Sequence, residues 1–143
     1  MMNREIKFRG KVKCYGFNNW IYGFYFEQDI ENVMNGITEC HGYIISSRNK
    51  RYAIEVNPET VGQYTGFHDR FGNEIYEGDI VYCQTKFRKA KAIIKFIDGK
   101  FVAYWDSILT HPQNGHCIAC YEINKRFEVI GNIYDNPELL GGE

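Results

Sequence analysis

Cysteine spacing offers one candidate for metal chemistry. Cys117 and Cys120 are separated by two residues, as in half of a zinc knuckle, and the adjacent pair Cys40 and His41 could complete a tetrahedral site. Two adjacent residues would be strained in binding one ion, however, and a chain with five cysteines produces this spacing by chance. We therefore expect reduced thiols, no structural zinc and no Cys117–Cys120 disulfide, because an extended strand would keep those two sulfurs apart.

The histidines raise the question of general-base catalysis, and His68-Asp69 has the composition of a catalytic dyad. Adjacent residues on an extended chain point to opposite sides, so we expect both side chains to be solvated or Asp69 to cap its own turn. The sequence has no nucleophile elbow, no HExxH motif and no glycine-rich loop followed by Lys-Ser or Lys-Thr. It predicts a protein with no catalytic residues and no cofactor.

A basic segment is the best candidate for nucleic-acid binding. Four cations with one interleaved aromatic follow Thr85: Lys86, Phe87, Arg88, Lys89 and Lys91. No acid occurs between Thr85 and Phe96. Lysines before an edge strand also block edge-to-edge pairing, and the net charge of −1 provides no overall attraction to phosphate. We favour the edge-protecting role, and a nucleic-acid contact here, aided by the basic residues of segment 5–13, is the alternative.

The chain has 11 tyrosines, which suit interfaces because one end of the ring is polar. Several fall in predicted strands: Tyr64, Tyr76, Tyr82, Tyr104, Tyr121 and Tyr134. Tyrosine is equally at home on half-buried strands that have no partner. Binding of a protein partner or of a second copy and a purely structural role therefore both remain open.

Composition indicates the elements that must position these residues. The 143 residues include 17 Ile and 7 Val but only 3 Leu and 5 Ala, together with 23 aromatic residues, which favours strands over helices. One all-β domain is expected at this length. We also expect a cytoplasmic protein, because no apolar stretch is long enough for a membrane span and the first ten residues do not resemble a signal peptide.

Alternation of polar and apolar residues predicts two hairpins in the first 60 residues. Strands over 5–14 and 20–26 form the first, and strands over 43–46 and 52–56, joined by a basic turn, form the second. The polar segment 27–42 is expected to be a long excursion with one helical turn at most. Asn57-Pro58 predicts a single helical turn.

Turn signals divide the remainder into short strands. These are expected at 63–67, 74–76, 80–83, 92–97, 100–105, 118–123 and 127–134, with Asp98-Gly99 as a hairpin turn. Such spacing favours a small bent barrel, so we expect subdomains of about 1–60 and about 61–143. Strand parity predicts that the following residues are mostly buried: Ile6, Phe8, Val12, Trp20, Ile80, Ile94, Phe96, Val102, Val129 and Ile133.

Four segments together resemble the YopX family of phage and prophage proteins. The segment Thr60–Val81 (TVGQYTGFHDRFGNEIYEGDIV) is similar to the central motif of the family. Arg4–Lys11, Trp20–Gly23 and Phe127–Leu140 are similar to its opening strand, to its Trp and Gly pattern and to its closing segment. The four pieces occur in the family's order and span nearly the whole chain.

The resemblance implies an SH3-like barrel in the C-terminal half, after an N-terminal β-meander, and a phage or prophage protein in the bacterial host. It implies no established activity and offers no ligand residues. Phe67, His68 and Phe71 depart from the usual pattern and are expected to leave Phe67 and Phe71 exposed at a loop tip. Two hypotheses follow: a protein-interaction or homo-oligomerising module that has Phe67 and Phe71 in its surface, and, as the alternative, a nucleic-acid-binding barrel.

Overall fold

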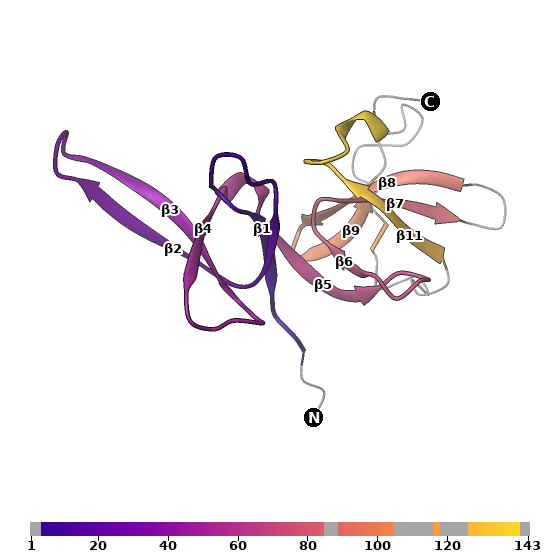
Figure 1. The fold of residues 1–143 in the computed structure, drawn as a ribbon. Helices are drawn as coiled ribbons and strands as arrows, with labels where there is room; N and C mark the ends of the chain where they lie inside the picture. Colours follow the sequence, from indigo (N-terminus) through magenta and orange to yellow (C-terminus); the bar gives the residue numbers. More distant parts are fainter. Residues whose placement is uncertain (1–3, 85–88, 105–115, 118–125, 141–143) are drawn as a thin grey trace. The chain divides into compact units, whose positions relative to one another are not determined.

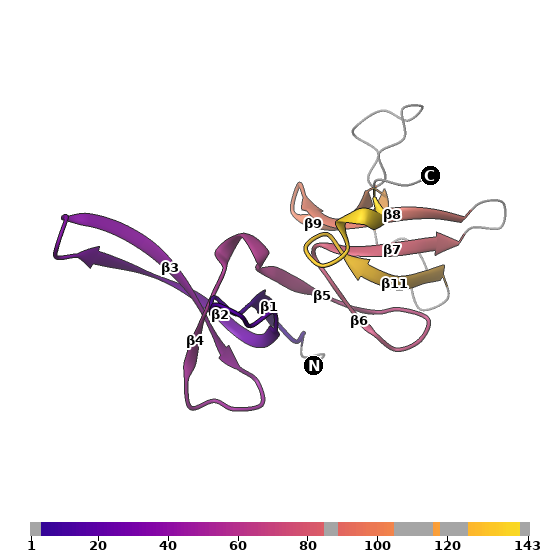
Figure 2. The same cartoon turned by 45° about the horizontal axis from the view of Figure 1, so that its top comes forward.

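The computed structural model describes residues 4–84, 89–104, 116–117 and 126–140, and this part of the chain is all-β with antiparallel strands (Figures 1 and 2). The predicted fold class is confirmed. The chain divides into two compact units, Met1–Gln63 and Tyr64–Glu143, which we call the N-terminal and C-terminal units. No helix in the described residues is long and apolar enough to span a membrane.

The N-terminal unit has four antiparallel strands in the spatial order β4-β3-β2-β1. Their bounds are β1 Phe8–Lys11, β2 Trp20–Asn32, β3 Ile37–Ser46 and β4 Ala53–Val56, followed by a 3-10 turn at Pro58–Thr60. Both predicted hairpins and the predicted helical turn are present. Segment 27–42, however, was wrongly expected to be an excursion: it forms the outer halves of β2 and β3, whose register runs unbroken from Gly23↔Ser46 to Asn32↔Ile37.

The base of this unit closes on itself. The chain just after β1 pairs with β4 through an antiparallel bridge between Val12 and Val56, with Lys13 N donating to Glu55 O at 2.9 Å. Ile44 and Val56 are fully buried inside the closed base. Gly10 packs closely against both side chains, since a Cβ at this position would come within 3.2 Å of each of them. The base therefore has its own small core.

Gly23 sits where β2 leaves this closed base. An added Cβ at this position would overlap the carbonyl oxygen of Ile45 on the neighbouring strand. Glycine is needed here because the two backbones approach closely. Beyond Gly23, β2 has no pairing with β1, which reaches only Trp20–Gly23, and β4 reaches β3 only at Gly42–Ile45. We call the hairpin of residues 24–45 the arm; its outer part, residues 28–41, continues beyond both β1 and β4 as a two-stranded ribbon, and it is the long hairpin at the indigo-to-purple end in Figure 1.

The C-terminal unit contains a sheet with the order β10-β9-β8-β7-β11 and a hairpin of β5 with β6. Their bounds are β5 Gly62–His68, β6 Glu74–Tyr76, β7 Asp79–Gln84, β8 Lys89–Ile97, β9 Lys100–Tyr104, β10 His116–Cys117 and β11 Phe127–Asn132, with a 3-10 turn at Pro137–Leu139. Asp98 and Gly99 have φ values of 52° and 77°, which is the left-handed geometry that a tight hairpin turn requires. The predicted strand at 118–123 lies outside the described residues.

One apolar cluster forms the core of the C-terminal unit. Its members are Ile75, Val81, Cys83, Ala92, Ile94, Phe101, Ala103 and Phe127, with Phe67 and Val129 packed against them. The buried carboxylate of Asp69 stabilises its own turn and ties it to β11, because it accepts hydrogen bonds from Phe71 N, Asn73 N and Val129 N, each at 2.9 Å. The SH3-like form of this unit stays a prediction.

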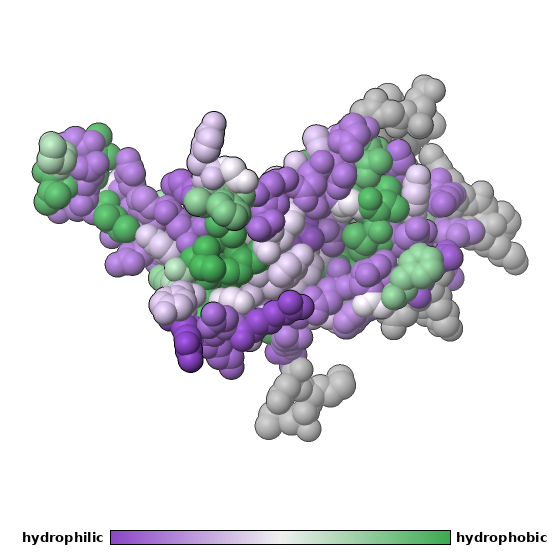
Figure 3. Space-filling view, in the orientation of Figure 1, coloured by the Kyte–Doolittle hydropathy of each residue, from purple (hydrophilic) through white to green (hydrophobic). Residues whose placement is uncertain are grey.

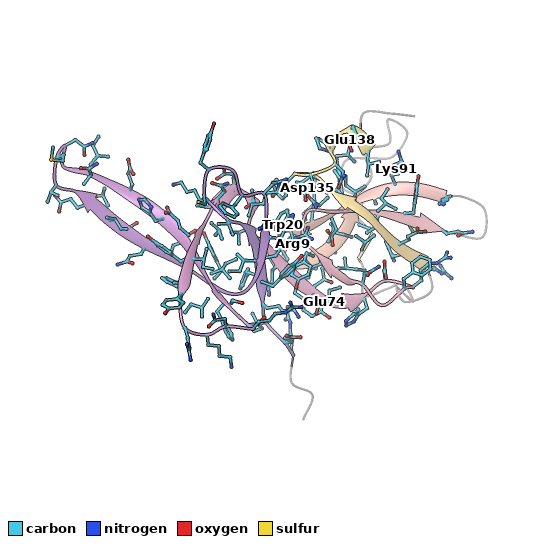
Figure 4. All side chains as sticks on the ribbon, in the orientation of Figure 1. Arg9, Trp20, Glu74, Lys91, Asp135 and Glu138 are labelled. Carbon is cyan, nitrogen blue, oxygen red and sulfur yellow. The ribbon has the colours of Figure 1, made fainter. Side chains whose placement is uncertain are left out.

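The expected burial is wrong at three positions. Ile6 and Phe96 are 53% and 52% exposed. Ile6 precedes β1 and Phe96 lies two residues before the Asp98-Gly99 turn, so parity places both near strand ends where little covers them. Arg9, which the alternation of charged and apolar residues in segment 5–14 places on the charged outer face, is buried with its guanidinium 4.7 Å above the Trp20 ring (Figure 4). Ile80, Ile94 and Val102 are buried as predicted, and Phe8, Val12, Trp20, Val129 and Ile133 are half-buried.

Candidate functional site

The two faces of the arm differ in chemistry. Directly opposed residues of paired strands share a face, and successive residues alternate between faces. The register Phe26↔Tyr43 therefore defines a mainly apolar face with Phe24, Phe26 and Ile30 on β2 and Ile37, Tyr43 and Ile45 on β3; the polar residues Gln28, Glu39 and His41 share this face. The register Asp29↔Cys40 defines an acidic face with Glu27, Asp29 and Glu31 on β2. The arm is an amphipathic ribbon.

The apolar face is open to solvent. Phe24 is 57% exposed, Ile37 55%, and Phe26 and Ile30 39% each. The rings of Phe26 and Tyr43 stack across the strands with centroids 5.4 Å apart. Such a cross-strand pair stabilises a ribbon by about 0.2–1 kcal/mol. Exposed aromatic and aliphatic side chains grouped on one face are typical of a protein-binding surface.

The tip of the arm continues this apolar surface. Val33 and Met34 are 95% and 94% exposed, and Figure 3 shows hydrophobic surface at this end of the arm. The turn that presents them is well formed: Asn32 Oδ1 accepts from Met34 N, Asn35 Oδ1 accepts from Ile37 N, both at 2.9 Å, and Gly36 has a φ of 69°. Their exposure therefore results from a hydrogen-bonded turn.

The acidic face carries no basic residue. Segment 14–47 contains no Lys or Arg, and within the described residues no Lys or Arg forms an ion pair with the acids of the arm. Tyr25 Oη donates to Glu27 Oε1 at 2.8 Å, and Cys40 Sγ lies 3.6 Å from Glu27 Oε2. Desolvation, and then the Glu27 carboxylate, raise the pKa of the Cys40 thiol, which makes it a poor nucleophile and a poor metal ligand. This face therefore offers negative charge without reactive chemistry.

A polar cluster connects the apolar face with the base of the unit. His41 Nδ1 lies 2.6 Å from Glu55 Oε1, and Lys13 Nζ lies 3.3 Å from the same oxygen. His41 Nε2 lies 3.5 Å from Glu39 Oε2. The hydrogen bond with His41 lowers the pKa of Glu55. These contacts join β3 to β4 and to the chain after β1, so we assign the cluster to the stability of the base.

Two of the four candidate zinc ligands, Cys40 and His41, are not arranged to bind one ion together. Cys40 and His41 are adjacent on β3 and therefore point to opposite faces of the ribbon. The side chain of Cys117 and the whole of Cys120 lie outside the described part of the structure. No group of at least three His, Cys, Asp or Glu side chains in the described chain is arranged to hold a metal ion. His68 is exposed beside the Tyr64 ring, whereas Asp69 is only 2% exposed and caps its turn, so the two do not form a dyad.

The basic segment is only partly described. Lys86, Phe87 and Arg88 lie outside the described residues. Lys89 is exposed, with its Nζ 4.1 Å above the Tyr82 ring, and Lys91 Nζ donates to the Leu139 carbonyl at 2.9 Å (Figure 4). Lys91 is therefore engaged in holding the C-terminal turn.

The basic residues of segment 5–13 also have local contacts. Lys7 pairs with Glu5 at 3.2 Å, Lys11 Nζ donates to Asn18 Oδ1 at 2.6 Å, and Lys13 contacts Glu55. Because these three lysines already have local partners, the segment is poorly suited to binding phosphates.

The aromatic residues singled out in the C-terminal unit separate into core and surface. Phe67 packs against the apolar core, so its expected exposure is wrong, whereas Phe71 is 63% exposed beneath the Arg70 guanidinium. Tyr64 and Tyr76 are buried with ring centroids 5.5 Å apart. Tyr82, Tyr104 and Tyr134 are half-buried, and Tyr121 lies outside the described residues. Tyr64 and Tyr76 therefore serve the core, and the exposed aromatic surface is concentrated on the arm instead.

Reasoning from the sequence missed the arm, although two signals mark it. Asn35-Gly36 is a strong hairpin dipeptide, and the apolar residues Phe24, Phe26 and Ile30 keep the parity of a strand. The acids of the segment suggested a loop because Glu and Asp are depleted in strands. Glu27, Asp29 and Glu31 recur at every second position, so they all lie on one face of β2 and are compatible with a strand.

Comparison with known proteins finds one family whose model matches nearly the whole chain. A family model described as YopX protein matches residues 7–141. Among solved structures, the crystal structure of protein EF1440 from Enterococcus faecalis is similar at 24% sequence identity, with coverage of 96% of this chain and 99% of that chain and a TM-score of 0.46. No curated protein matches the chain.

Proposed function

The chain belongs to the YopX family, and we propose that it is a non-catalytic protein-interaction module whose binding element is the arm, residues 24–45. One observation carries the proposal: the arm holds an exposed apolar face, and its outer part, residues 28–41, is a ribbon that neither β1 nor β4 supports. A two-stranded ribbon is at best marginally stable in water. Covering its apolar face with another protein stabilises it and removes exposed apolar area.

The negative charge of the arm favours a protein partner over a nucleic acid. Its acids, Glu27, Asp29, Glu31 and Glu39, are not balanced by any Lys or Arg in the same segment. Phosphate backbones repel such a surface, because nucleic-acid affinity comes mainly from Lys and Arg contacts with phosphates. The alternative function, nucleic-acid binding through segment 86–91, would have to use a surface remote in sequence from the arm.

Two further parts of the proposal concern origin and compartment. We place the protein in phages or prophages on the strength of its family resemblance. Action inside the bacterial host, in its cytoplasm, is consistent with exposed free thiols at Cys14 and Cys40, since cytosolic proteins keep their cysteines reduced.

A cross-linking experiment in cells tests the proposed function. A photo-reactive amino acid replaces Met34 at the tip of the arm, and the matched control carries it at Lys100, which is exposed at the start of β9. We expect protein adducts from position 34 and none of comparable yield from position 100. Adducts to nucleic acid from position 34, or equal adduct patterns from both positions, would contradict the proposal.

A further inference from the structure

The ends of strand β3 carry opposite charge. Its first half belongs to the acidic arm, and its last residue, Ser46, leads into the turn Ser47–Tyr52, which contains Arg48, Lys50 and Arg51. All three cations are exposed, and in the described part of the chain none of them forms an ion pair. The N-terminal unit thus has an acidic end and a basic end.

The basic turn is well ordered. Ser46 Oγ accepts hydrogen bonds from Arg48 N at 3.2 Å and from Asn49 N at 3.4 Å, and Asn49 Oδ1 accepts from Arg51 N at 3.2 Å. Side chains therefore satisfy the backbone of the turn, and the three cationic side chains project from a fixed loop. Tyr52 beside them is 69% exposed, so cationic and aromatic surface occur together.

We propose that the arm of one copy of this chain docks on the basic turn, residues 47–52, of a second copy. The inference rests on the proposed function and names its partner. The arm supplies carboxylates and an apolar face, and the turn supplies three cations and an aromatic ring, so both kinds of surface are matched. The long stems of Arg and Lys can cover the apolar side chains while their charged ends reach Glu39, which lies on the apolar face opposite Ile30, and, around the edge of the ribbon, the carboxylates of the acidic face.

Charge and distance exclude the simpler pairings. Two arms packed through their acidic faces would bring six carboxylates against each other, and two arms packed through their apolar faces would bring the two Glu39 carboxylates against apolar side chains, with no Lys or Arg of the arms between them in either case. The tip of an arm cannot reach the turn of its own chain, because the ten residues of β3 separate the tip from the turn by about 30 Å of extended strand. The contact is therefore between different surfaces on two copies, which produces a ring or a filament rather than a two-fold dimer.

Charge reversal tests the contact. The arm variant carries Glu27→Lys, Asp29→Lys and Glu31→Lys, and the turn variant carries Arg48→Glu, Lys50→Glu and Arg51→Glu. A control with the same change of charge, Glu5→Lys, Glu59→Lys and Glu138→Lys, alters exposed acids away from both surfaces. Sedimentation velocity measures the mass of each full-length protein at low salt over a range of concentrations.

We expect the unmodified protein and the control to assemble, and the arm and turn variants each to associate at least tenfold more weakly. Mixing the two variants should restore assembly, because each reversed surface then meets its complement on the other chain. This mixture also distinguishes loss of contact from failure to fold. Raising the salt concentration to 1 M should weaken the assembly, since ions screen exposed charges.

Three results would overturn the inference. The unmodified protein could have the mass of a single chain at all concentrations, or the arm variant could assemble as well as the unmodified protein. The third such result is that the mixture of the two variants assembles no better than either variant alone. These results are separable from failure of the proposed function. Adducts from position 34 to a different protein would leave the interaction module in place and exclude only the second copy as its partner.

Discussion

The rings of Phe26 and Tyr43 stack across the two strands of the arm, with centroids 5.4 Å apart and planes 20° apart, on the face opposite to Glu27. Phe26 remains 39% exposed in this arrangement. The stack makes the apolar face flat and rigid, which reduces the entropy lost when another surface covers it. A structural role alone would not require an arm that carries three of its four acids, Glu27, Asp29 and Glu31, on the face opposite to its aromatic stack.

Asp69 is predicted to be the most sensitive polar side chain of the C-terminal unit. In Asp69→Asn the new amide NH2 would face the donors Val129 N and Asn73 Nδ2, which now bond to Asp69 Oδ2. Unsatisfied buried donors cost about 1–3 kcal/mol each, so we expect the free energy of unfolding to fall by about 2–3 kcal/mol. Urea denaturation measures it. The control Asp98→Asn, at an exposed turn position that Asn tolerates, should change it by less than about 0.5 kcal/mol, and equal effects at both positions would refute the assigned role.

The same carboxylate predicts a pH dependence. Burial raises the pKa of Asp69, but hydrogen bonds from Val129, Asn73 and Phe71 outweigh this and hold it below its ordinary value of 3.8. The unfolded chain therefore takes up a proton at higher pH than the folded chain does. The stabilisation is complete above about pH 5 and is lost as the pH falls through the folded value. Urea denaturation between pH 6 and pH 3 should show a smaller loss in Asp69→Asn than in the unmodified protein; parallel losses would contradict this.

Gly23 is predicted to be essential for the arm. In Gly23→Ala the Cβ would overlap the carbonyl oxygen of Ile45, so the pairing of β2 with β3 must shift. We expect a loss of about 3 kcal/mol or more in the free energy of unfolding. Gly16→Ala is the matched control, because its φ is 85° but nothing lies within 4 Å of its Cβ position, and it should cost about 1 kcal/mol. A Gly23→Ala protein as stable as the control would show that the close approach does not matter.

Replacing Lys86, Arg88, Lys89 and Lys91 together by Gln tests the alternative function. We expect weak binding to random DNA at low ionic strength that this substitution leaves unchanged, a melting temperature close to that of the unmodified protein and a greater tendency to aggregate. Fluorescence anisotropy with labelled DNA and thermal denaturation measure these properties. Sub-micromolar, salt-sensitive DNA binding that the substitution abolishes would favour the nucleic-acid alternative.

Local signals predicted most of the fold. Parity and turn residues placed the strands around Asp98-Gly99 and the hairpin of β5 with β6 because those patterns act within a few residues. The arm was missed because Glu27, Asp29 and Glu31 made a solvated ribbon resemble a loop, and only the register with β3 shows that they share a face. Burial at Arg9 depends on Trp20, a contact that a single strand pattern does not reveal.

The resemblance predicted the YopX family correctly but predicted no residues of a functional site. Phe67, predicted at an exposed tip, is partly buried against the core cluster that contains Phe127, whereas Phe71 is exposed to solvent. Alternation alone places a residue on a face, but it does not say what covers that face.

Hydrogen–deuterium exchange of the arm amides tests the central claim most directly. In an isolated two-stranded ribbon the outward-facing amides of residues 27–32 and 37–41 exchange rapidly, and a docked partner slows them. With the unmodified protein at low and high concentration, we predict slower exchange at high concentration in the arm and in residues 47–52, with no change in the core strand β7. Rapid exchange of the arm at every concentration, in a protein whose mass stays that of one chain, would contradict the account.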